Sequence, residues 1–160
     1  MAGYWHDIDE DTPKDESSVD ETTKAFSGGF FQTGDIGFQD KDGYFYIVDR
    51  AKEMIVSGGE NVYAGEVEAA IYEIPGVKEA AVFGIPDEKW GELVAAAIVL
   101  RPETTLSAEE LMQYCKKKVA SYKVPRHIDF LTGELPKSGS GKILKRVLRE
   151  KYWSGQSRRV

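Results

Sequence analysis

The spacing of apolar and polar positions predicts two hairpins in the first part of the chain. In residues 38–48 (FQDKDGYFYIV), apolar flanks surround an Asp-Gly turn. In residues 53–65 (EMIVSGGENVYAG), Gly58 and Gly59 can supply the positive φ angles of a tight turn. Short strands are therefore expected on both sides of each turn.

Three helices are predicted by apolar positions at intervals of three and four residues. The first covers residues 65–74 and is ended by Pro75-Gly76. The second covers residues 107–119 and opens with a capping box, Ser107 with Glu110. The third covers residues 143–153. Their expected apolar faces are Val67, Ala70, Ile71 and Ile74; then Leu111, Tyr114 and Cys115, with Val119 at the margin; then Ile143, Leu144, Val147, Leu148 and Tyr152.

Three apolar runs, residues 77–85, 93–101 and 127–131, have the length of strands. The elements then follow the order hairpin, hairpin, helix, strand, strand, helix, strand, helix, and no internal repeat is visible. This order predicts an α+β fold, a small mixed sheet with helices packed on it.

Composition narrows the class of protein. The chain has 160 residues, of which 41% are hydrophobic and 30% charged, as is typical of a globular protein. No apolar run approaches the ~18 residues of a membrane span, and the first residues lack the pattern of a signal peptide. Cys115 is the only cysteine, and the two histidines, His6 and His127, have no partner at metal-ligand spacing. We therefore expect a cytoplasmic protein with no membrane span and no metal site of its own.

Charge is distributed unevenly along the chain. Residues 7–21 hold eight acidic residues and one lysine, a net charge of −7, whereas residues 142–160 carry +6. Residues 8–21 have no apolar periodicity, so they are expected to form a mobile loop. A basic end can meet phosphates, but for the last five residues (QSRRV) a solvated tail is the favoured interpretation.

Residues 135–146 (LPKSGSGKILKR) look at first like a phosphate cradle around Lys142. A Walker A loop would need glycine where Pro136 stands and Ser or Thr where Ile143 stands, so that reading is set aside. Two readings stay open from these residues alone. Lys142 is an anion-binding lysine at or near the start of the last helix, or it is a solvated surface lysine.

Three further stretches change this picture. Residues 33–71, 84–92 (GIPDEKWGE) and 122–146, which open with YKVP and end with LPKSGSGKILKR, resemble the AMP-forming acyl-CoA synthetases in order and approximate spacing. This superfamily also includes the adenylation domains of nonribosomal peptide synthetases and firefly luciferase. The initial Gly-Tyr-Trp matches a segment of the same family, so the resemblance covers nearly the whole chain apart from the acidic stretch and the tail.

The resemblance implies roles for four residues in the formation of an acyl-adenylate. Asp35 corresponds to the aspartate that binds the ribose hydroxyls of ATP, a task that suits a carboxylate acceptor. Arg50 corresponds to a second ribose or phosphate contact, and Lys52 to the hinge about which the small C-terminal domain swings. Lys142 corresponds to the catalytic lysine that reaches the substrate carboxylate and the α-phosphate.

The resemblance also implies a coenzyme A site. Residues 57–62 (SGGENV), with Ser57, Gly58 and Gly59, correspond to the loop that lines the pantetheine tunnel after the swing. Trp90, Lys123 and Arg126 are weaker candidates for contacts with coenzyme A.

Two departures from the family are visible. Ala64 stands where the family usually has proline, and residues 8–21 resemble a surface insertion. The family's large N-terminal domain is not in this sequence, so we expect a fragment, a truncated product or one piece of a split enzyme. Residues 1–50 would be the end of that domain, including the hairpin; residues 51–152 the mobile C-terminal domain; and residues 153–160 a basic tail.

The expected function is that of the C-terminal part of an ATP-dependent acyl-CoA synthetase, an acid-thiol ligase. Such an enzyme converts a carboxylic acid, ATP and coenzyme A into acyl-CoA, AMP and diphosphate. Its Mg²⁺ would be bound mainly by the N-terminal domain, which is the expected partner; no nucleic acid is expected. Residues 58–68 (GGENVYAGEVE) together with residues 122–125 (YKVP) favour fatty-acyl or aryl-acid ligases over peptide synthetases, and a luciferase-type oxygenase is less favoured. The alternative is a free-standing binding or regulatory module that has lost turnover.

Overall fold

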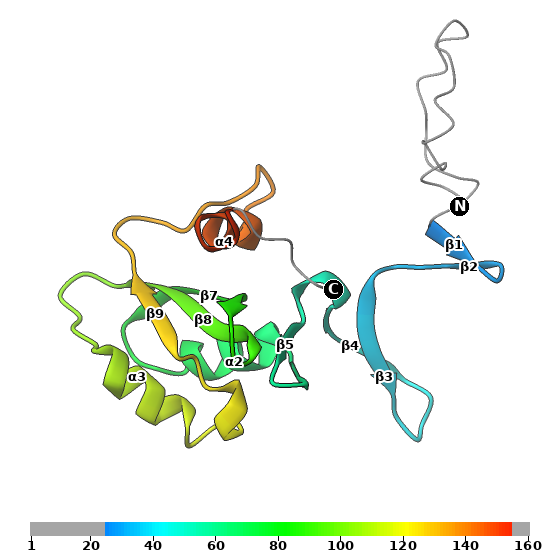
Figure 1. Ribbon diagram of the computed structural model, residues 1–160, viewed down its shortest axis with the longest axis horizontal. Helices are drawn as coiled ribbons and strands as arrows, with labels where there is room; N and C mark the ends of the chain where they lie inside the picture. Colours follow the sequence, from blue (N-terminus) through cyan, green and yellow to red (C-terminus); the bar gives the residue numbers. More distant parts are fainter. Residues whose placement is uncertain (1–24, 155–160) are drawn as a thin grey trace, which may run out of the picture. The chain divides into compact units, whose positions relative to one another are not determined.

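The structure is a computed structural model that describes residues 25–154 (Figure 1). The acidic stretch 8–21 and residues 155–160 of the basic tail lie outside this range, so the expectations for them stay predictions. The chain divides into two compact units, Met1–Asp35 and Ile36–Val160, and each is described by itself. In the first unit, strands β1 (Phe26–Ser27) and β2 (Phe30–Phe31) form a short antiparallel hairpin.

Both hairpins predicted from the sequence are present. Strands β3 (Asp35–Gln39) and β4 (Phe45–Arg50) pair with each other, and Gly43 takes a φ of 90° in their loop. Strands β5 (Ile55–Ser57) and β6 (Glu60–Val62) are joined by a two-residue turn. Gly58 and Gly59 have φ angles of 61° and 86° there, as a turn that matches the twist of the strands requires.

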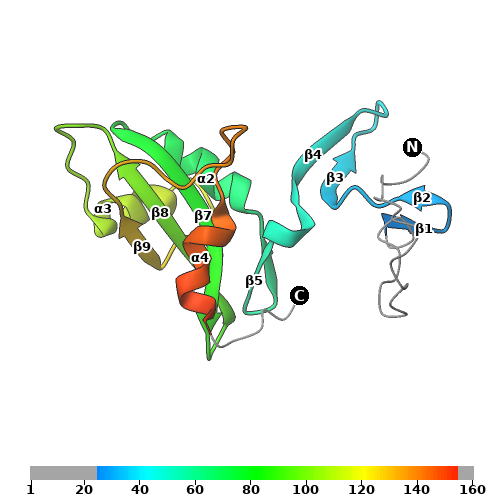
Figure 2. The same ribbon diagram turned by 90° about the horizontal axis from the view of Figure 1, so that it is seen from above.

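The central sheet has five strands and mixed direction, which confirms the predicted α+β fold (Figure 2). Strand β7 (Val77–Asp87) runs antiparallel to β8 (Gly91–Leu100) along its whole length. On the other edge of β8, β5 pairs at one end, where Ser57 faces Gly91, and β9 (His127–Phe130) pairs in parallel with Ala95–Ile98.

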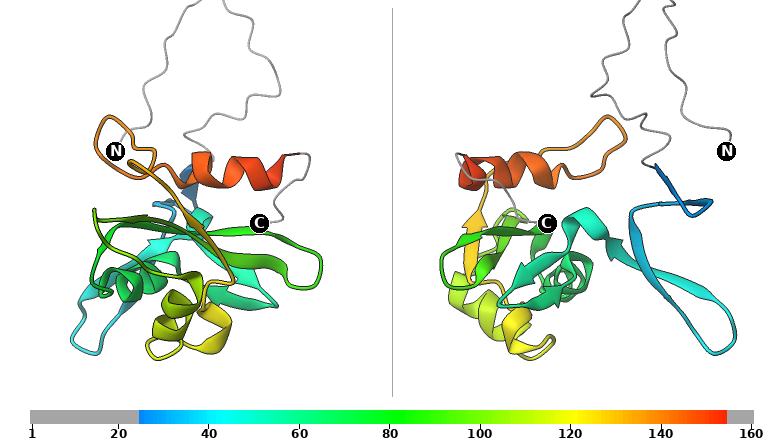
Figure 3. Two further views of the ribbon diagram at one scale, coloured as in Figure 1. Left: turned by 90° about the vertical axis from the view of Figure 1, so that its left-hand side faces the viewer. Right: turned by 45° about the vertical axis from the view of Figure 1, so that its right-hand side comes forward.

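Helices cover both faces of this sheet. Helices α2 (Ala64–Tyr72) and α3 (Ala108–Cys115) lie on one face, and α4 (Lys145–Trp153) lies on the other (Figure 3). Side chains of β7 and β8 alternate between two apolar clusters, one with Val82 and Ile98 and one with Phe83 and Val99. This two-sided burial explains why both strands read as nearly continuous apolar runs.

All three helices differ from the boundaries that the sequence predicts. Helix α2 begins one residue earlier than predicted and ends two residues earlier, at Tyr72. Helix α3 ends at Cys115 instead of Val119, because the amides of Lys117 and Lys118 bond to carbonyls three residues back and tighten the last turn. Its capping box is present as predicted. Helix α4 begins at Lys145 instead of Ile143, which pairs with Lys137 in a short bridge.

The apolar face of α4 is also narrower than predicted. Leu148 and Tyr152 pack against the sheet, and so does Ile143 just before the helix. Leu144 and Val147 are 37% and 42% exposed. Among residues 25–154, no helix is long and apolar enough to cross a membrane.

Candidate functional site

Lys142 lies in a small, internally bonded loop. The Ser138 amide donates to the Lys142 carbonyl at 2.8 Å, and the Lys142 amide donates to Ser138 Oγ at 3.2 Å. The Gly141 amide donates to the Ser138 carbonyl at 2.9 Å, with Gly141 at a φ of 80°. These amides are therefore not open to an anion, and α4 begins three residues later. What the loop offers is the exposed side chain of Lys142 on a defined backbone.

The base of this loop is held by a buried carboxylate. Glu79 on β7 accepts hydrogen bonds from the Leu135 amide at 2.8 Å and from Lys137 Nζ at 2.7 Å. The Lys137 ammonium and the Leu135 amide hold the pKa of Glu79 below its usual value. Lys137 bridges to Ile143, so the two ends of the loop are tied to the sheet.

A second cluster of candidate residues gathers around Trp90. Asp87 Oδ1 accepts the amides of Lys89 and Trp90 at 2.9 and 2.8 Å, which shapes the turn between β7 and β8. The Gly58 amide donates to the Trp90 carbonyl at 2.8 Å. Because Gly58 has no side chain, the indole can pack directly on it; a Cβ there would lie 2.6 Å from Trp90 Cε3.

Two cations lie over the Trp90 ring. The Arg126 guanidinium carbon is 5.1 Å from the ring centroid and Lys89 Nζ is 4.8 Å from it, both within cation–π range. Sequence reasoning singled out Arg126 and missed Lys89, although Lys89 precedes Trp90 directly. Thus the structure brings together Gly58, Trp90 and Arg126, with Ser57 and Gly59 on the same turn.

Lys123 belongs to a different contact. Its ammonium lies 2.6 and 2.8 Å from the two carboxylate oxygens of Glu66 at the start of α2, and this pairing raises the Lys123 pKa. The side chain is 16% exposed, so Lys123 anchors the segment 121–123 to α2 as well as carrying charge. No local sequence pattern marks Glu66 as the partner of Lys123.

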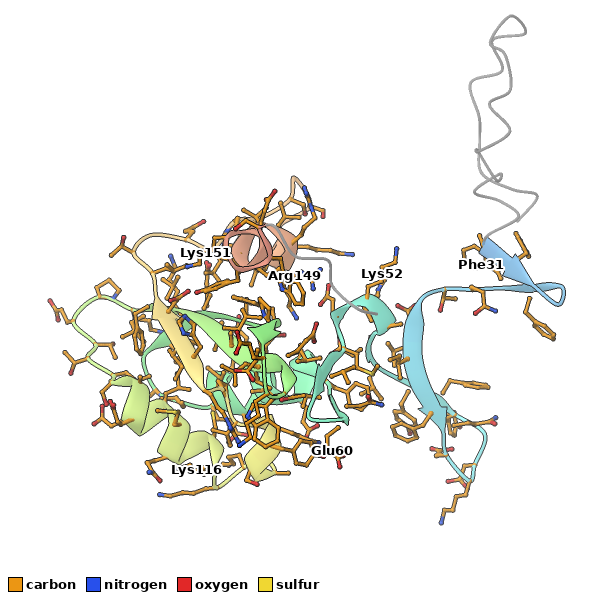
Figure 4. The ribbon with its side chains drawn as sticks, in the orientation of Figure 1. Phe31, Lys52, Glu60, Lys116, Arg149 and Lys151 are labelled. Carbon is orange, nitrogen blue, oxygen red and sulfur yellow. The ribbon has the colours of Figure 1, made fainter. Side chains whose placement is uncertain are left out.

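The predicted hinge lies in a short helical turn, η1 (Ala51–Glu53), between β4 and β5. Lys52 is exposed on this turn (Figure 4). Arg50 is the exposed last residue of β4, and its neighbour Asp49 accepts the Gly65 amide of α2 at 3.1 Å. The hinge segment is therefore adjacent to the first turn of α2.

Asp35 stands at the start of β3 and is half buried; its amide donates to Thr33 Oγ1 at 3.1 Å. Asp35 is the last residue of the first compact unit, whereas Arg50, Lys52 and Lys142 belong to the second. The described residues contain no group of three or more His, Cys, Asp or Glu side chains arranged to hold a metal ion.

Comparison with known proteins decides the family. Residues 66–142 match the model of the AMP-binding enzyme C-terminal domain. The chain belongs to the adenylate-forming superfamily. The resemblance seen in the sequence motifs is thereby confirmed, and Trp90, Lys123, Arg126 and Lys142 all lie within the matched residues.

Individual relatives are acyl-CoA and aryl-CoA ligases. The chain is 52% identical over 131 residues to the long-chain-fatty-acid–CoA ligase FadD13 of Mycobacterium tuberculosis, covering 82% of the chain and 26% of that protein. It is 41% identical over 152 residues to feruloyl-CoA synthase of Amycolatopsis sp., covering 95% of the chain and 28% of that protein. The chain thus spans about a quarter of the length of these relatives.

Solved structures agree with this assignment. The ATP-bound MatB from Rhodopseudomonas palustris matches with a TM-score of 0.78 and 36% identity, over 85% of this chain and 27% of that chain. The adenylate-forming C-terminal domain in this protein therefore presents two sets of candidate residues, the Lys142 loop and the Trp90 cluster.

Proposed function

We propose that this chain is the C-terminal part of an ATP-dependent acyl-CoA synthetase, which joins a carboxylic acid to coenzyme A through an acyl-adenylate. The observation that carries the proposal is the exposed Lys142 on an internally bonded loop. A carboxylate that attacks an α-phosphate brings two anions together, so a cation held at that point lowers the barrier. Within residues 25–154 the Lys142 side chain has no carboxylate partner that would hold it away from such a substrate.

Asp35, Arg50 and Lys142 are proposed to act in the adenylation step. Asp35 would accept the ribose hydroxyls of ATP and Arg50 would contact ribose or phosphate. ATP and its Mg²⁺ would be held mainly by the N-terminal region that the relatives possess. The exposed position of Arg50 at the end of β4 fits a residue that completes a site with another part of the protein.

The Trp90 cluster is proposed to bind coenzyme A. Coenzyme A carries phosphates, an adenine ring and a narrow pantetheine arm. Arg126 supplies positive charge, Trp90 supplies an aromatic face, and the Ser57–Gly59 turn allows close approach of a thin chain. Lys123, which pairs with Glu66, is proposed as a further contact outside this cluster. The residues present therefore fit this ligand.

The domain boundary is proposed to lie near Lys52. Residues 1–50 would be the end of the N-terminal domain, and residues 51–152 the mobile domain. The hairpin β3–β4 belongs to the second compact unit, but its exposed side chains favour this division, because Phe45 and Ile47 are 80% and 74% exposed, a pattern typical of a surface that packs against another domain. The relatives of this chain include fatty-acid and aryl-acid ligases, so we propose a fatty or aromatic acid as the substrate.

The alternative function, a binding or regulatory module without turnover, differs in one measurable respect. Such a module would keep the Trp90 cluster and would not need Lys142. Joint presence of Asp35, Arg50, Lys52 and Lys142 favours the ligase.

The test separates the two half-reactions in the complete enzyme, in which an N-terminal region is joined to this chain. Lys142→Ala should slow adenylation, measured by diphosphate release, by about 10²–10³-fold. Thioester formation from supplied acyl-adenylate should be unchanged, because no charge then builds on an attacked phosphate. Lys116→Ala, an exposed lysine after α3, is the matched control and should change neither. Equal loss in both half-reactions for Lys142→Ala would mean that the lysine is structural.

A further inference from the structure

Lys145, the first residue of α4, is a buried cation that joins three separate segments. Its side chain is 12% exposed, and its ammonium lies 2.9 Å from Glu68 Oε1 and 3.0 Å from Glu53 Oε2. Glu68 belongs to α2, and Glu53 ends the hinge turn η1. The sequence pattern assigns no partner to Lys145, so its burial is a new observation.

The charges of this cluster are strongly coupled. Desolvation alone would lower the pKa of Lys145, but the negative charge and hydrogen bonds of Glu68 and Glu53 outweigh it and raise the pKa. Burial raises the pKa of Glu68, and the nearby Asp49 carboxylate adds to that rise. Removing Lys145 would leave carboxylates without their cation in a low-dielectric site, which is costly.

The two carboxylates have different roles because of what else they contact. Glu68 Oε1 also accepts the Val82 amide of β7 at 2.7 Å, so Glu68 is fixed to the sheet. Glu53 is 36% exposed, and it directly follows Lys52 in the chain. Glu68 therefore anchors Lys145 to the body of the domain, and Lys145 in turn holds the last residue of the hinge turn.

Lys145 also lies close to Lys142 along the chain. The residues between them are tied down, since the Leu144 amide donates to the Pro136 carbonyl at 2.7 Å and Ile143 bridges to Lys137. A continuous set of contacts thus connects the hinge turn, through Glu53 and Lys145, with the loop that carries Lys142.

We propose that Lys145 is a positioning residue for adenylation, which clamps Glu53 to α4 and so marks where the flexible hinge ends. This inference rests on the proposed function, in which Lys142 is catalytic and Lys52 is the hinge. With the clamp present, all residues after Lys52 turn as one body and Lys142 reaches a single position. Without the ion pair between Lys145 and Glu53, residues after Lys52 can also move, and Lys142 samples many positions relative to the reacting anions.

The first measurement uses the 160-residue chain itself. The Met54 amide donates to the Arg50 carbonyl at 3.2 Å and closes the hinge turn, so its hydrogen exchange reports the order of that turn. Lys145→Met and Glu53→Gln should each speed Met54 exchange by about tenfold or more. Lys118→Met is the matched control: it removes an exposed ion pair with Glu73, at 2.5 Å, between α2 and the end of α3, and should leave Met54 unchanged.

The second measurement uses the complete enzyme and the adenylation half-reaction. Lys145→Met and Glu53→Gln should each lower kcat about tenfold and leave KM for ATP within about twofold, since neither side chain contacts substrate. The double variant should be no slower than Lys145→Met alone, because that change already removes the contact with Glu53. Lys145→Arg, which keeps the charge, should recover most of the rate.

The outcomes separate this inference from the function on which it rests. Unchanged Met54 exchange and unchanged adenylation in Glu53→Gln, in an enzyme that Lys142→Ala disables, would overturn the clamp and leave the proposed function standing. If Lys142→Ala itself keeps full adenylation, both fail. Because Glu53 is partly exposed, Glu53→Gln keeps the test valid even if Lys145→Met does not fold.

Discussion

Single residues decide how the Trp90 cluster is built, and Gly58 is the clearest case. Its neighbour Gly59 shares the same turn and also has a positive φ, so alanine is strained at both positions. Only at Gly58 would the new Cβ meet Trp90, whereas nothing lies within 4 Å of the corresponding point on Gly59. The pair therefore isolates the effect of the indole contact.

We predict that Gly58→Ala lowers the free energy of unfolding by about 1–3 kcal/mol more than Gly59→Ala does. The backbone strain is common to both variants, and the difference comes from forcing Trp90 off the turn. Urea unfolding followed by tryptophan fluorescence measures both quantities. Equal losses in the two variants would show that Trp90 adapts without cost, and that the close approach of Gly58 is incidental.

At the scale of elements, the loop 137–143 depends on the ionisation of Glu79. Its pKa in the folded protein is lowered from its ordinary value of 4.5, chiefly by its hydrogen bond to the Lys137 ammonium. A lowered pKa means that the contact stabilises the fold fully above pH 4.5 and that this stability is lost as the pH falls through the folded-state pKa.

We therefore predict that Glu79→Gln reduces the loss of stability as the pH falls below 4.5, relative to the unaltered chain. The variant should be less stable at pH 7, since the charged pair is gone. Thermal midpoints measured across this pH range provide the check, with Glu88→Gln in the exposed turn between β7 and β8 as the control. A variant whose pH profile parallels that of the unaltered chain would contradict the assignment.

The hinge turn η1 makes a second prediction at this scale. Lys52→Pro fixes φ near −65° at the residue about which the domain is proposed to turn. In the complete enzyme, we expect one half-reaction to survive and the other to fall sharply, because the locked hinge retains one orientation only. If that orientation is the one for adenylation, diphosphate release continues and consumption of coenzyme A from supplied acyl-adenylate falls. Comparable rates for both steps in this variant would place the hinge elsewhere.

Residues that are neighbours in sequence predicted the helices, strands and turns well, but they did not predict the contacts between residues far apart in the chain. The turn at Gly58-Gly59, the capping box of α3 and the apolar runs of β7 and β8 follow from neighbours in sequence, so they could be read from the chain alone. The start of α4 could not be read from the sequence, because Ile143 forms an antiparallel β-bridge with Lys137 instead of joining the helix.

The same limit applies to the candidate site. Lys142 and Trp90 were recognised from motifs, whereas the partners of Lys123 and Lys145 were not. Glu66 is 57 residues from Lys123 and Glu68 is on another helix than Lys145, so no local pattern marks either pair. A charged residue on an amphipathic helix reads as solvated until the fold places a carboxylate beside it.

At the scale of the whole molecule, the exposed apolar side chains of the β3–β4 hairpin resemble half of an interface. Phe38, Tyr44, Phe45 and Ile47 are 57%, 68%, 80% and 74% exposed. The core of the C-terminal domain, by contrast, is closed on both faces of its sheet by helices. The domain can therefore be stable by itself, and the hairpin contacts it near the end of β4, where Asp49 accepts the Gly65 amide of α2.

We predict from this contrast that replacing Phe45 and Ile47 together by Ser and Thr reduces self-association of the isolated chain and changes its thermal midpoint by less than about 2 °C. The hairpin adds little to the core, so its side chains should affect solubility more than stability. Sedimentation at several concentrations and a thermal scan give the two values. A drop of many degrees would show that the hairpin is part of the cooperative core.

The last prediction concerns the activity of the isolated chain. Lys142 supplies a cation, but Asp35, the proposed ribose contact, lies in the other compact unit, and the relatives have about three quarters of their length beyond the part that matches. A single lysine cannot position a carboxylate and ATP for attack, since most of the rate enhancement requires both reactants to be held in place. We therefore expect no acyl-adenylate from the 160-residue chain with ATP and a panel of fatty and aromatic acids, measured by diphosphate exchange. Diphosphate exchange above that of a Lys142→Ala control would show that these residues form a sufficient site. When an N-terminal region is added as a second chain, we expect exchange only if the exposed β3–β4 hairpin can dock onto that region.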